Sequence, residues 1–361
     1  HVHLRDPGQT YKETVETGAA AAAHGGFTTV LAMPNTKPVT DDRLNIRYVH
    51  NKAKAMAPIH VLQAGAITKG QKGKELADID SMVAEGSPAI SEDGRSVMDS
   101  LLCKEAMKIA AECGVPVMAH CEDIDLMDGG VANDDEYIRK QGLRGISNAV
   151  EDIIAVRDVM LAGETGAHLH LCHCSTYGSV EIVRQAKKHG INVTAEVCPH
   201  HFTLTSKDVD AGDANYKMNP PLRTKKDVEA LKRGLRDDIM DVIATDHAPH
   251  TAEEKAREFA KAPSGITGLE TAFSVCNTYL VQTGKLTPMQ LVDRMSKTSA
   301  EIYGLTDRAV QAGNFARLVL LDWDTEKVYE TYKSKGINTP YTGKKLTGSP
   351  KAIVTGTKVT E

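Results

Sequence analysis

The chain contains 361 residues, of which 41% are apolar and 25% are charged, and its formal net charge is −5. This composition is ordinary for a folded globular protein and excludes a disordered, collagen-like or disulfide-stapled chain. The lack of a basic excess argues against a nucleic-acid partner, and no apolar run approaches the roughly 20 residues that a membrane-spanning helix needs. The seven cysteines are scattered and odd in number, which indicates reduced thiols and a cytoplasmic protein.

Short apolar runs alternate with longer helical segments along most of the chain. Strands are predicted at 28–32, 59–66, 88–91, 115–120, 167–173, 191–197 and 241–246. Helices are predicted at 11–24, 44–56, 101–113, 148–161, 179–189 and 226–236. A further strand is expected to end at residues 1–3, and most of it would precede His1. Alternation with about eight strands predicts an α/β protein built as a (β/α)8 TIM-like barrel.

The pattern of predicted elements changes near the C-terminal end of the chain. After two more predicted helices at 288–296 and 300–303, strands are predicted at 315–322 and 351–354, joined by turns rich in Gly and Thr. We therefore predict a barrel domain at 1–312 and, at 313–361, the C-terminal part of a small β domain. The N-terminal part of that domain would lie upstream of His1.

Side chains that can bind a metal stand at the ends of the predicted strands. His1 and His3 are two residues apart, so on a strand they would share one face. The others each end or closely follow a strand: Asp93, His120, His173 and Asp246. Since the carboxyl ends of barrel strands form one rim, these six side chains are expected to meet there.

Imidazole and carboxylate groups are ligands that Zn²⁺ accepts. A carboxylate bridging two ions about 3.5–4 Å apart would help to generate hydroxide near neutral pH, and a strand-end Asp could bind metal and shuttle a proton. Each residue alone could equally be a hydrogen-bonded core histidine or a helix cap. The combination favours a metal centre, whereas the neighbouring histidines 168, 170, 200 and 201 are interpreted as packing or supporting groups.

Several longer motifs resemble those of one family. HVHLRDPG at 1–8, AMPNTKP at 32–38, AHCED at 119–123, NPPLR at 219–223 and ATDHAPHTAEEK at 244–255 are similar to the motifs of bacterial class I dihydroorotases, which belong to the amidohydrolase superfamily. The resemblance spans essentially the whole chain. It implies a zinc-dependent cyclic amidohydrolase that interconverts N-carbamoyl-L-aspartate and L-dihydroorotate in de novo pyrimidine biosynthesis.

The resemblance also implies how metal would be bound. One or two zinc ions are expected, with two favoured. His1, His3 and Asp246 would bind one zinc, and His120 and His173 would bind the other.

A carboxylate would bridge the two ions. Many relatives use a carboxylated lysine there, but residues 88–96 contain no lysine, and Asp93 is the position that matches the aspartate of the class I enzymes. Chemistry alone leaves the adjacent Glu92 open. The resemblance makes Asp246 the catalytic proton shuttle.

Substrate contacts are implied at four positions. Arg5 would bind the substrate carboxylate, since its guanidinium matches a carboxylate in shape and charge. Asn35 and His250 would donate further hydrogen bonds, and Asn219 would bond the ring amide. Alternatively, Arg5 could pair with Asp6, and the two asparagines could be turn or loop residues.

Two other functions stay open. One is another cyclic amidase, such as an allantoinase or a dihydropyrimidinase, although the substrates of these enzymes carry no carboxylate for Arg5. The other is a catalytically silent scaffold for aspartate transcarbamoylase, although no expected metal ligand is missing. A small-molecule substrate and a homodimer are expected, with aspartate transcarbamoylase as a candidate partner.

Overall fold

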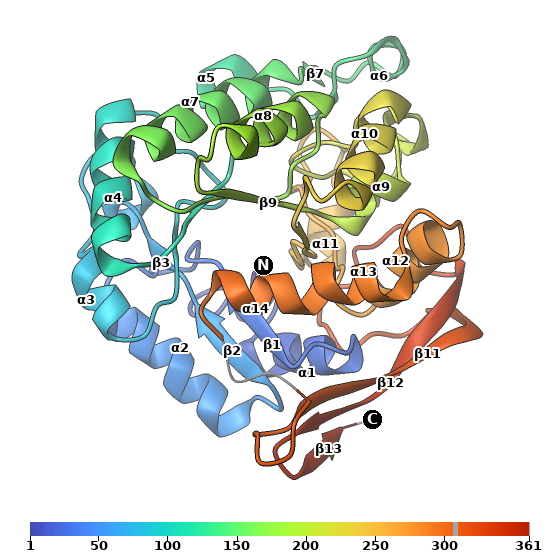
Figure 1. The fold of residues 1–361 in the computed structure, drawn as a ribbon. Coiled ribbons are helices and arrows are strands. Elements are labelled where there is room, and N and C mark those ends of the chain that lie inside the picture. Colours follow the sequence, from blue (N-terminus) through green and yellow to red (C-terminus); the bar gives the residue numbers. More distant parts are fainter. Residues whose placement is uncertain (306–309, 361) are drawn as a thin grey trace.

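Parallel strands lie in the middle of the molecule, with helices around them (Figure 1). The computed structural model describes residues 1–305 and 310–360. One sheet has the order β10-β9-β8-β5-β4-β3, and a second sheet pairs β1 with β2. These strands are β1 (Thr29–Ala32), β2 (His60–Gln63), β3 (Gly65–Ala66), β4 (Ile90–Ser91), β5 (Val117–Ala119), β8 (Leu169–Leu171), β9 (Val193–Val197) and β10 (Val242–Ile243). Every pairing among them is parallel, so the α/β class is confirmed, and each predicted strand is present with shorter bounds.

Backbone hydrogen bonds also connect the two sheets. At the break between β2 and β3, the N–H of Ala64 donates to Ala32 (2.9 Å), whereas the N–H of Gly65 donates to Ala89 (3.1 Å). On the other side, Val2 forms parallel bridges to both Ala32 and His247. The β1–β2 pair is therefore bonded to the β3 end of the larger sheet and, through Val2, to the segment that follows β10.

The main helices cover the outside of the strands and bury one face each. They are α1 (Val15–His24), α2 (Arg43–Met56), α4 (Ser100–Cys113), α7 (Ala149–Thr165), α8 (Tyr177–Lys188) and α10 (Lys225–Arg236), which confirms the six predicted helices. The N-cap carboxylates of Asp42 and Asp99 accept backbone N–H groups at the starts of α2 and α4. Gly114 and Gly166 end α4 and α7 at φ values of 69° and 74°, which glycine adopts without strain.

The start of α1 differs from the prediction. The helix begins at Val15 and not at residue 11, because Thr14 and Thr17 form a reciprocal cap at its first turn. Residues 5–12 instead form a loop beside the strand ends. No helix in the described ranges is both long and apolar enough to cross a membrane.

Short elements fill the connections. They are α3 (Ile79–Ala84), α5 (Ile124–Met127), β6 (Ala132–Asn133), α6 (Glu136–Lys140), β7 (Gly145–Ile146), α9 (Pro199–Thr203), α11 (Ala252–Lys255), α12 (Ala272–Cys276), α13 (Pro288–Val292) and α14 (Thr298–Ile302).

Three antiparallel strands form the last part of the chain. They are β11 (Arg317–Val328), β12 (Lys345–Thr355) and β13 (Lys358–Thr360), and they lie at one edge of the molecule (Figure 1). Both C-terminal strands predicted from the sequence are confirmed and are longer than expected. Ile353 of β12 is buried in the cluster that also contains the alanines of α1. The division of the chain at residues 312 and 313 stays a prediction.

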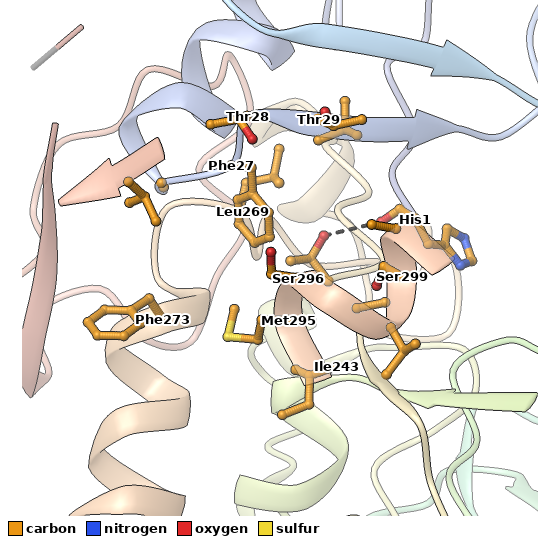
Figure 2. Close-up of a pocket in the computed structure, with 18 of the residues that line it drawn as sticks. His1, Phe27, Thr28, Thr29, Ile243, Leu269, Phe273, Met295, Ser296 and Ser299 are labelled. Atoms are coloured by element: carbon orange, nitrogen blue, oxygen red, sulfur yellow. Dashed lines mark hydrogen bonds between the residues drawn. The ribbon is translucent and has the colours of Figure 1, made fainter. Parts of the chain in front are cut away.

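A cavity of about 240 Å³ lies between β1, the segment after β10 and the helices near the C-terminus. Its lining is largely apolar and includes Phe27, Leu269, Phe273 and Met295 (Figure 2). His1 stands at its edge, with the imidazole ring pointing away from these side chains (Figure 2). The cavity therefore lies behind His1, apart from the other five predicted metal ligands, none of which lines it.

Candidate metal centre

The six side chains predicted to bind metal come together at the ends of the parallel strands. His1 and His3 flank the Val2 bridge, and the other four follow strand ends: Asp93 after β4, His120 after β5, His173 after β8 and Asp246 after β10. The ring centroids of His1 lie 5.5 Å from those of both His3 and His173. Residues that are up to 245 positions apart thus share one small polar centre.

One group consists of His1, His3 and Asp246. The Nε2 atom of His3 lies 3.0 Å from Oδ1 of Asp246, and Nε2 of His1 lies 3.6 Å from the same oxygen. Two ligand atoms on a tetrahedral zinc, each about 2.0–2.1 Å from the ion, are about 3.3 Å apart. The spacing of these three side chains therefore suits joint coordination of one ion.

A second group consists of His120, His173 and Asp93. Oδ1 of Asp93 lies 3.4 Å from Nε2 of His173 and 3.6 Å from Nδ1 of His120, and these two nitrogens are 2.9 Å apart. Asp93 also faces the first group, at 3.5 Å from His1 and 3.3 Å from His3. Among the described residues, this carboxylate is therefore the one group that is within 3.6 Å of all four imidazoles.

Glu92 points elsewhere. Its carboxylate accepts hydrogen bonds from the backbone N–H and the hydroxyl of Thr68, and burial raises its pKa. The geometry thus distinguishes two neighbouring acids that the sequence could not, because Asp93 faces the four imidazoles and Glu92 does not.

Two of these residues adopt a backbone conformation that is unusual for side chains with a Cβ. The φ angles are 34° at His173 and 44° at Asp246. Each such residue costs on the order of 1–3 kcal/mol and is retained where surrounding contacts hold it. The turns rotate both side chains inward directly after their strands, which a count of alternating strand positions does not anticipate.

The imidazoles are oriented by partners on their other nitrogens. Nδ1 of His1 donates to Glu196 (2.7 Å), and Nδ1 of His3 donates to Oδ1 of Asn35 (2.8 Å). These bonds turn both Nε2 atoms toward the centre, where each can bind a cation while Nδ1 keeps its proton, as is usual for histidines that bind metal.

The donor set fits a metal cation. Nε2 of His1 and Oδ1 of Asp93 are buried and have no hydrogen-bond partner among the described residues. Buried polar atoms are rarely left unpaired unless an ion or water completes the site. Burial alone would raise the pKa of Asp93, but the facing His1, His120 and His173 hold it well below its usual range, so an anionic carboxylate stands ready for a cation.

Comparisons with known proteins identify relatives of the chain. A family model described as "Dihydro-orotase-like" matches residues 1–179. A dihydroorotase from Bacillus caldolyticus is 48% identical over 364 residues, covering 100% of this chain and 85% of that protein. A dihydroorotase from Geobacillus kaustophilus has the same identity and coverage. The chain belongs to the dihydroorotase family. The resemblance inferred from the sequence motifs is thereby confirmed.

Solved structures related to this dihydroorotase-family chain share its fold. The L-hydantoinase (dihydropyrimidinase) from Arthrobacter aurescens superimposes with a TM-score of 0.89 over 99% of this chain and 83% of that chain, at 23% identity. A D-hydantoinase (dihydropyrimidinase) from a Thermus species gives 0.82 over 99% of this chain and 82% of that chain, at 24% identity. At such identities the likeness establishes the fold alone.

Arg5 is the first of the four predicted substrate contacts. It does not pair with Asp6, whose carboxylate binds Lys52 at 2.7 Å. Its guanidinium instead lies 3.4 Å from the carbonyl of Pro249 and 3.4 Å from Nε2 of His250. Arg5 forms no ion pair with any described side chain, so its charge is available to an anionic ligand.

His250 has both ring nitrogens occupied. Lys12 donates to Nδ1 (3.2 Å), and Nε2 donates to the carbonyl of Ser264 (2.9 Å). Burial together with Arg5 and Lys12 lowers the pKa of His250 to about 2, so the ring is neutral. A hydrogen bond from this ring to substrate stays a prediction and would require one of these partners to be released.

The two predicted asparagines also have partners. Asn35 supports His3, as described above, and the side-chain amide of Asn219 donates to Glu122 (2.5 Å). Glu122 in turn lies 3.5 Å from Nε2 of His120. The structure therefore brings Asn35 and Asn219 to the centre, but it shows them bonded to protein groups.

Sequence reasoning missed Glu122, Lys12 and Glu196. Glu196 offered a usable signal, because it is an ionisable residue in the middle of an apolar strand run, a place where charged side chains are rarely found unpaired. The other two lie in loops and carried no such signal.

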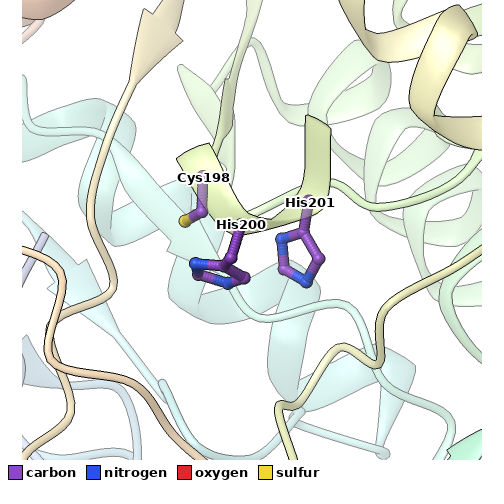
Figure 3. Close-up of side chains that lie close together, drawn as sticks. All are labelled: Cys198, His200 and His201. Atoms are coloured by element: carbon purple, nitrogen blue, oxygen red, sulfur yellow. The ribbon is translucent and has the colours of Figure 1, made fainter. Parts of the chain in front are cut away.

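A further cluster of metal-type side chains lies at the start of α9. Cys198, His200 and His201 are all buried there (Figure 3). Nε2 of His201 donates to the carbonyl of Pro220 (2.8 Å), and burial lowers the pKa of His201 to about 3. This hydrogen bond between α9 and the following loop is consistent with the supporting role expected for His201.

Proposed function

We propose that this chain is a metal-dependent dihydroorotase that interconverts N-carbamoyl-L-aspartate and L-dihydroorotate in pyrimidine biosynthesis. The observation that carries the proposal is the convergence of four imidazoles on the central carboxylate of Asp93, in a chain 48% identical to a dihydroorotase. We expect the enzyme to act in the cytoplasm and to form a homodimer, with aspartate transcarbamoylase as a candidate partner.

The fold that supports this site is best described as a (β/α)8 barrel. Val2 supplies one strand position, bonded on one side to β1 and on the other to the segment after β10. β2 and β3 act as one strand with a break at Ala64. Counted in this way, eight parallel strands follow one another in a ring, and the candidate centre lies at their carboxyl ends, where barrel enzymes carry their active sites.

Zinc is the metal that this set of nitrogen and oxygen donors fits, and two ions are favoured because Asp93 faces both groups. His1, His3 and Asp246 would hold one ion, and His120 and His173 the other. When bound, the metal would polarise the scissile carbonyl and lower the pKa of water.

Asp246 is placed to move the proton. Burial would raise the pKa of its carboxyl, but His3 and His1 outweigh that effect and keep it ionised at neutral pH. In the hydrolytic direction Asp246 accepts the proton of the attacking water and returns it to the ring nitrogen as the amide bond breaks. In the biosynthetic direction the same carboxylate takes the proton from the carbamoyl nitrogen.

Arg5 favours a substrate that carries a carboxylate. Dihydroorotate and carbamoyl aspartate both do, whereas allantoin and dihydrouracil do not. A partly buried guanidinium without a carboxylate partner is costly unless the ligand supplies one. Arg5 therefore argues against an allantoinase or dihydropyrimidinase activity, even though the similar solved structures are hydantoinases.

The proposal is tested by measuring ring opening of L-dihydroorotate, allantoin and dihydrouracil with the same enzyme preparation, and by quantifying its metal. We expect efficient turnover of dihydroorotate alone. Turnover of either neutral ring in preference to dihydroorotate would assign the chain to another cyclic amidase. A metal-free protein that is inactive on all three would instead support the scaffold function.

A further inference from the structure

One buried carboxylate, Glu196 of β9, contacts residues from both halves of the candidate centre. Its Oε1 atom accepts a hydrogen bond from Nδ1 of His1 (2.7 Å) and another from the backbone N–H of His173 (3.2 Å). Its Oε2 atom lies 3.2 Å from Nε2 of His170. Both carboxylate oxygens are therefore occupied, and two of the three partners belong to predicted metal ligands.

The contact with His1 decides which nitrogen of the ring faces the centre. The bond from Nδ1 to Glu196 orients the ring so that Nε2 points toward Asp93 at 3.5 Å, and it keeps Nδ1 as the protonated nitrogen when Nε2 binds a cation. The opposite tautomer would carry its proton on Nε2 and could not bind a cation there.

The contact with His173 acts on the backbone. His173 has a φ angle of 34°, which a residue with a Cβ adopts only when its surroundings hold it. The N–H of this strained residue is bonded to Glu196. The same carboxylate thus helps to retain the turn that directs the His173 ring toward Asp93.

Burial makes these contacts strong and hard to replace. The side chains of His1 and Glu196 are 0% and 2% exposed, respectively. Glutamine in its place would offer the Nδ1–H of His1 and the N–H of His173 one neutral oxygen instead of a charged one, in a place that water does not easily reach. The adjoining cavity behind His1 includes Glu196 in its lining but is otherwise largely apolar.

We propose that Glu196 is a positioning residue shared by the two halves of the metal centre, so that its loss weakens every bound metal ion together. It is not a catalytic residue, because it stands behind the ligands and not beside the substrate. This inference rests on the proposed metal centre and assigns the role of one residue within it. It distinguishes Glu196 from Asn35, which contacts His3 alone among the predicted ligands.

The test compares zinc binding by the wild-type chain, Glu196→Gln and Glu13→Gln. Glu13 is a matched control, because its carboxylate is equally buried and accepts hydrogen bonds from Ser334 and from His247 (3.4 Å), but it touches none of the six predicted ligands. Metal-free protein is titrated with Zn²⁺ against a chromophoric chelator, and unfolding of each metal-free variant is followed by circular dichroism.

We expect each zinc equivalent of Glu196→Gln to bind about 10–100-fold more weakly than in the wild-type chain, as losses of such supporting carboxylates usually do. Glu13→Gln should bind zinc as the wild-type chain does. If any zinc equivalent in Glu196→Gln keeps wild-type affinity, the shared role is wrong. A wild-type chain that binds no zinc would instead refute the proposed metal centre itself.

A second measurement needs no substitution and covers the case in which Glu196→Gln does not fold. Nitrogen-15 NMR of the histidine rings of the zinc-loaded wild-type protein should show that His1 keeps its proton on Nδ1 and binds zinc through Nε2. A zinc-bound His1 that carries its proton on Nε2 would overturn the inference.

Discussion

Replacing Asp246 with asparagine tests the assigned proton transfer directly. Asparagine has nearly the same size and shape, so the contact at 3.0 Å to Nε2 of His3 can persist with the amide oxygen in place of a carboxylate oxygen. What changes is the charge and the ability to accept a proton. The substitution should therefore leave the fold intact and act on catalysis and on metal binding.

The expected magnitude follows from the two roles of this carboxylate. General acid–base catalysis contributes typically 10²- to 10⁴-fold, which corresponds to about 3–5 kcal/mol in the activation free energy. The same oxygen lies 3.0 Å and 3.6 Å from the Nε2 atoms of His3 and His1, so one metal position also loses a ligand. We expect Asp246→Asn to lower kcat/KM for dihydroorotate by at least about 10³-fold, even at saturating zinc.

The assay is the loss of ultraviolet absorbance as the dihydroorotate ring opens, measured over a range of zinc concentrations. Circular dichroism of the same samples checks that the variant is folded. Saturating zinc separates the two effects, since it restores metal occupancy but cannot restore the proton acceptor. Activity within about tenfold of the wild-type value under that condition would refute the role of Asp246 as the proton shuttle.

Three further substitutions test the electrostatics of the site and of helix α11. Asp93→Asn should abolish tight zinc binding while Glu92→Gln retains it, because only Asp93 of these two acids faces the imidazoles. Zinc affinities are measured by competition with a chelator, and equal affinities of the two variants would contradict the geometry. Burial and the nearby Lys217 lower the pKa of Lys255 from 10.5 to about 7. Between these pH values the unfolded chain binds more protons than the folded chain, so the free energy of unfolding rises with pH. Lys255→Met should reduce the increase in unfolding free energy by up to about 1.4 kcal/mol per pH unit. The measurement is urea unfolding of both proteins at pH values between about 7 and 10.5. If the unfolding free energies of the two proteins rise equally with pH, the assignment to Lys255 is wrong.

The sequence carried most of the information about the strands and about where they end. Apolar runs marked each parallel strand, and the residues at their carboxyl ends were the ones that meet in the structure. The break at Ala64 was not visible, because the run from 59 to 66 is continuous in hydropathy while its backbone partners change from β1 to β4.

The contacts that support the metal ligands could not be predicted from the sequence, because they depend on how distant segments pack together. Alternation along a strand separates His170 from His173, but the positive φ at His173 breaks the alternation, and both residues contact Glu196. The contacts of Glu196 with His170 and His173 can be predicted only once β8 and β9 are known to be neighbours. Likewise, the choice between Asp93 and Glu92 depended on the position of Thr68, which lies in a loop 24 residues away.

The central claim is that the histidines and aspartates at the strand ends hold metal together. It is tested most directly by crystallising the zinc-loaded protein and locating zinc from its anomalous scattering. We predict two zinc peaks about 3.5–4 Å apart on either side of Asp93, one beside His1, His3 and Asp246 and the other beside His120 and His173. Fully loaded crystals with no peak among these side chains, or with zinc only at Cys198 and its neighbouring histidines, would contradict the account.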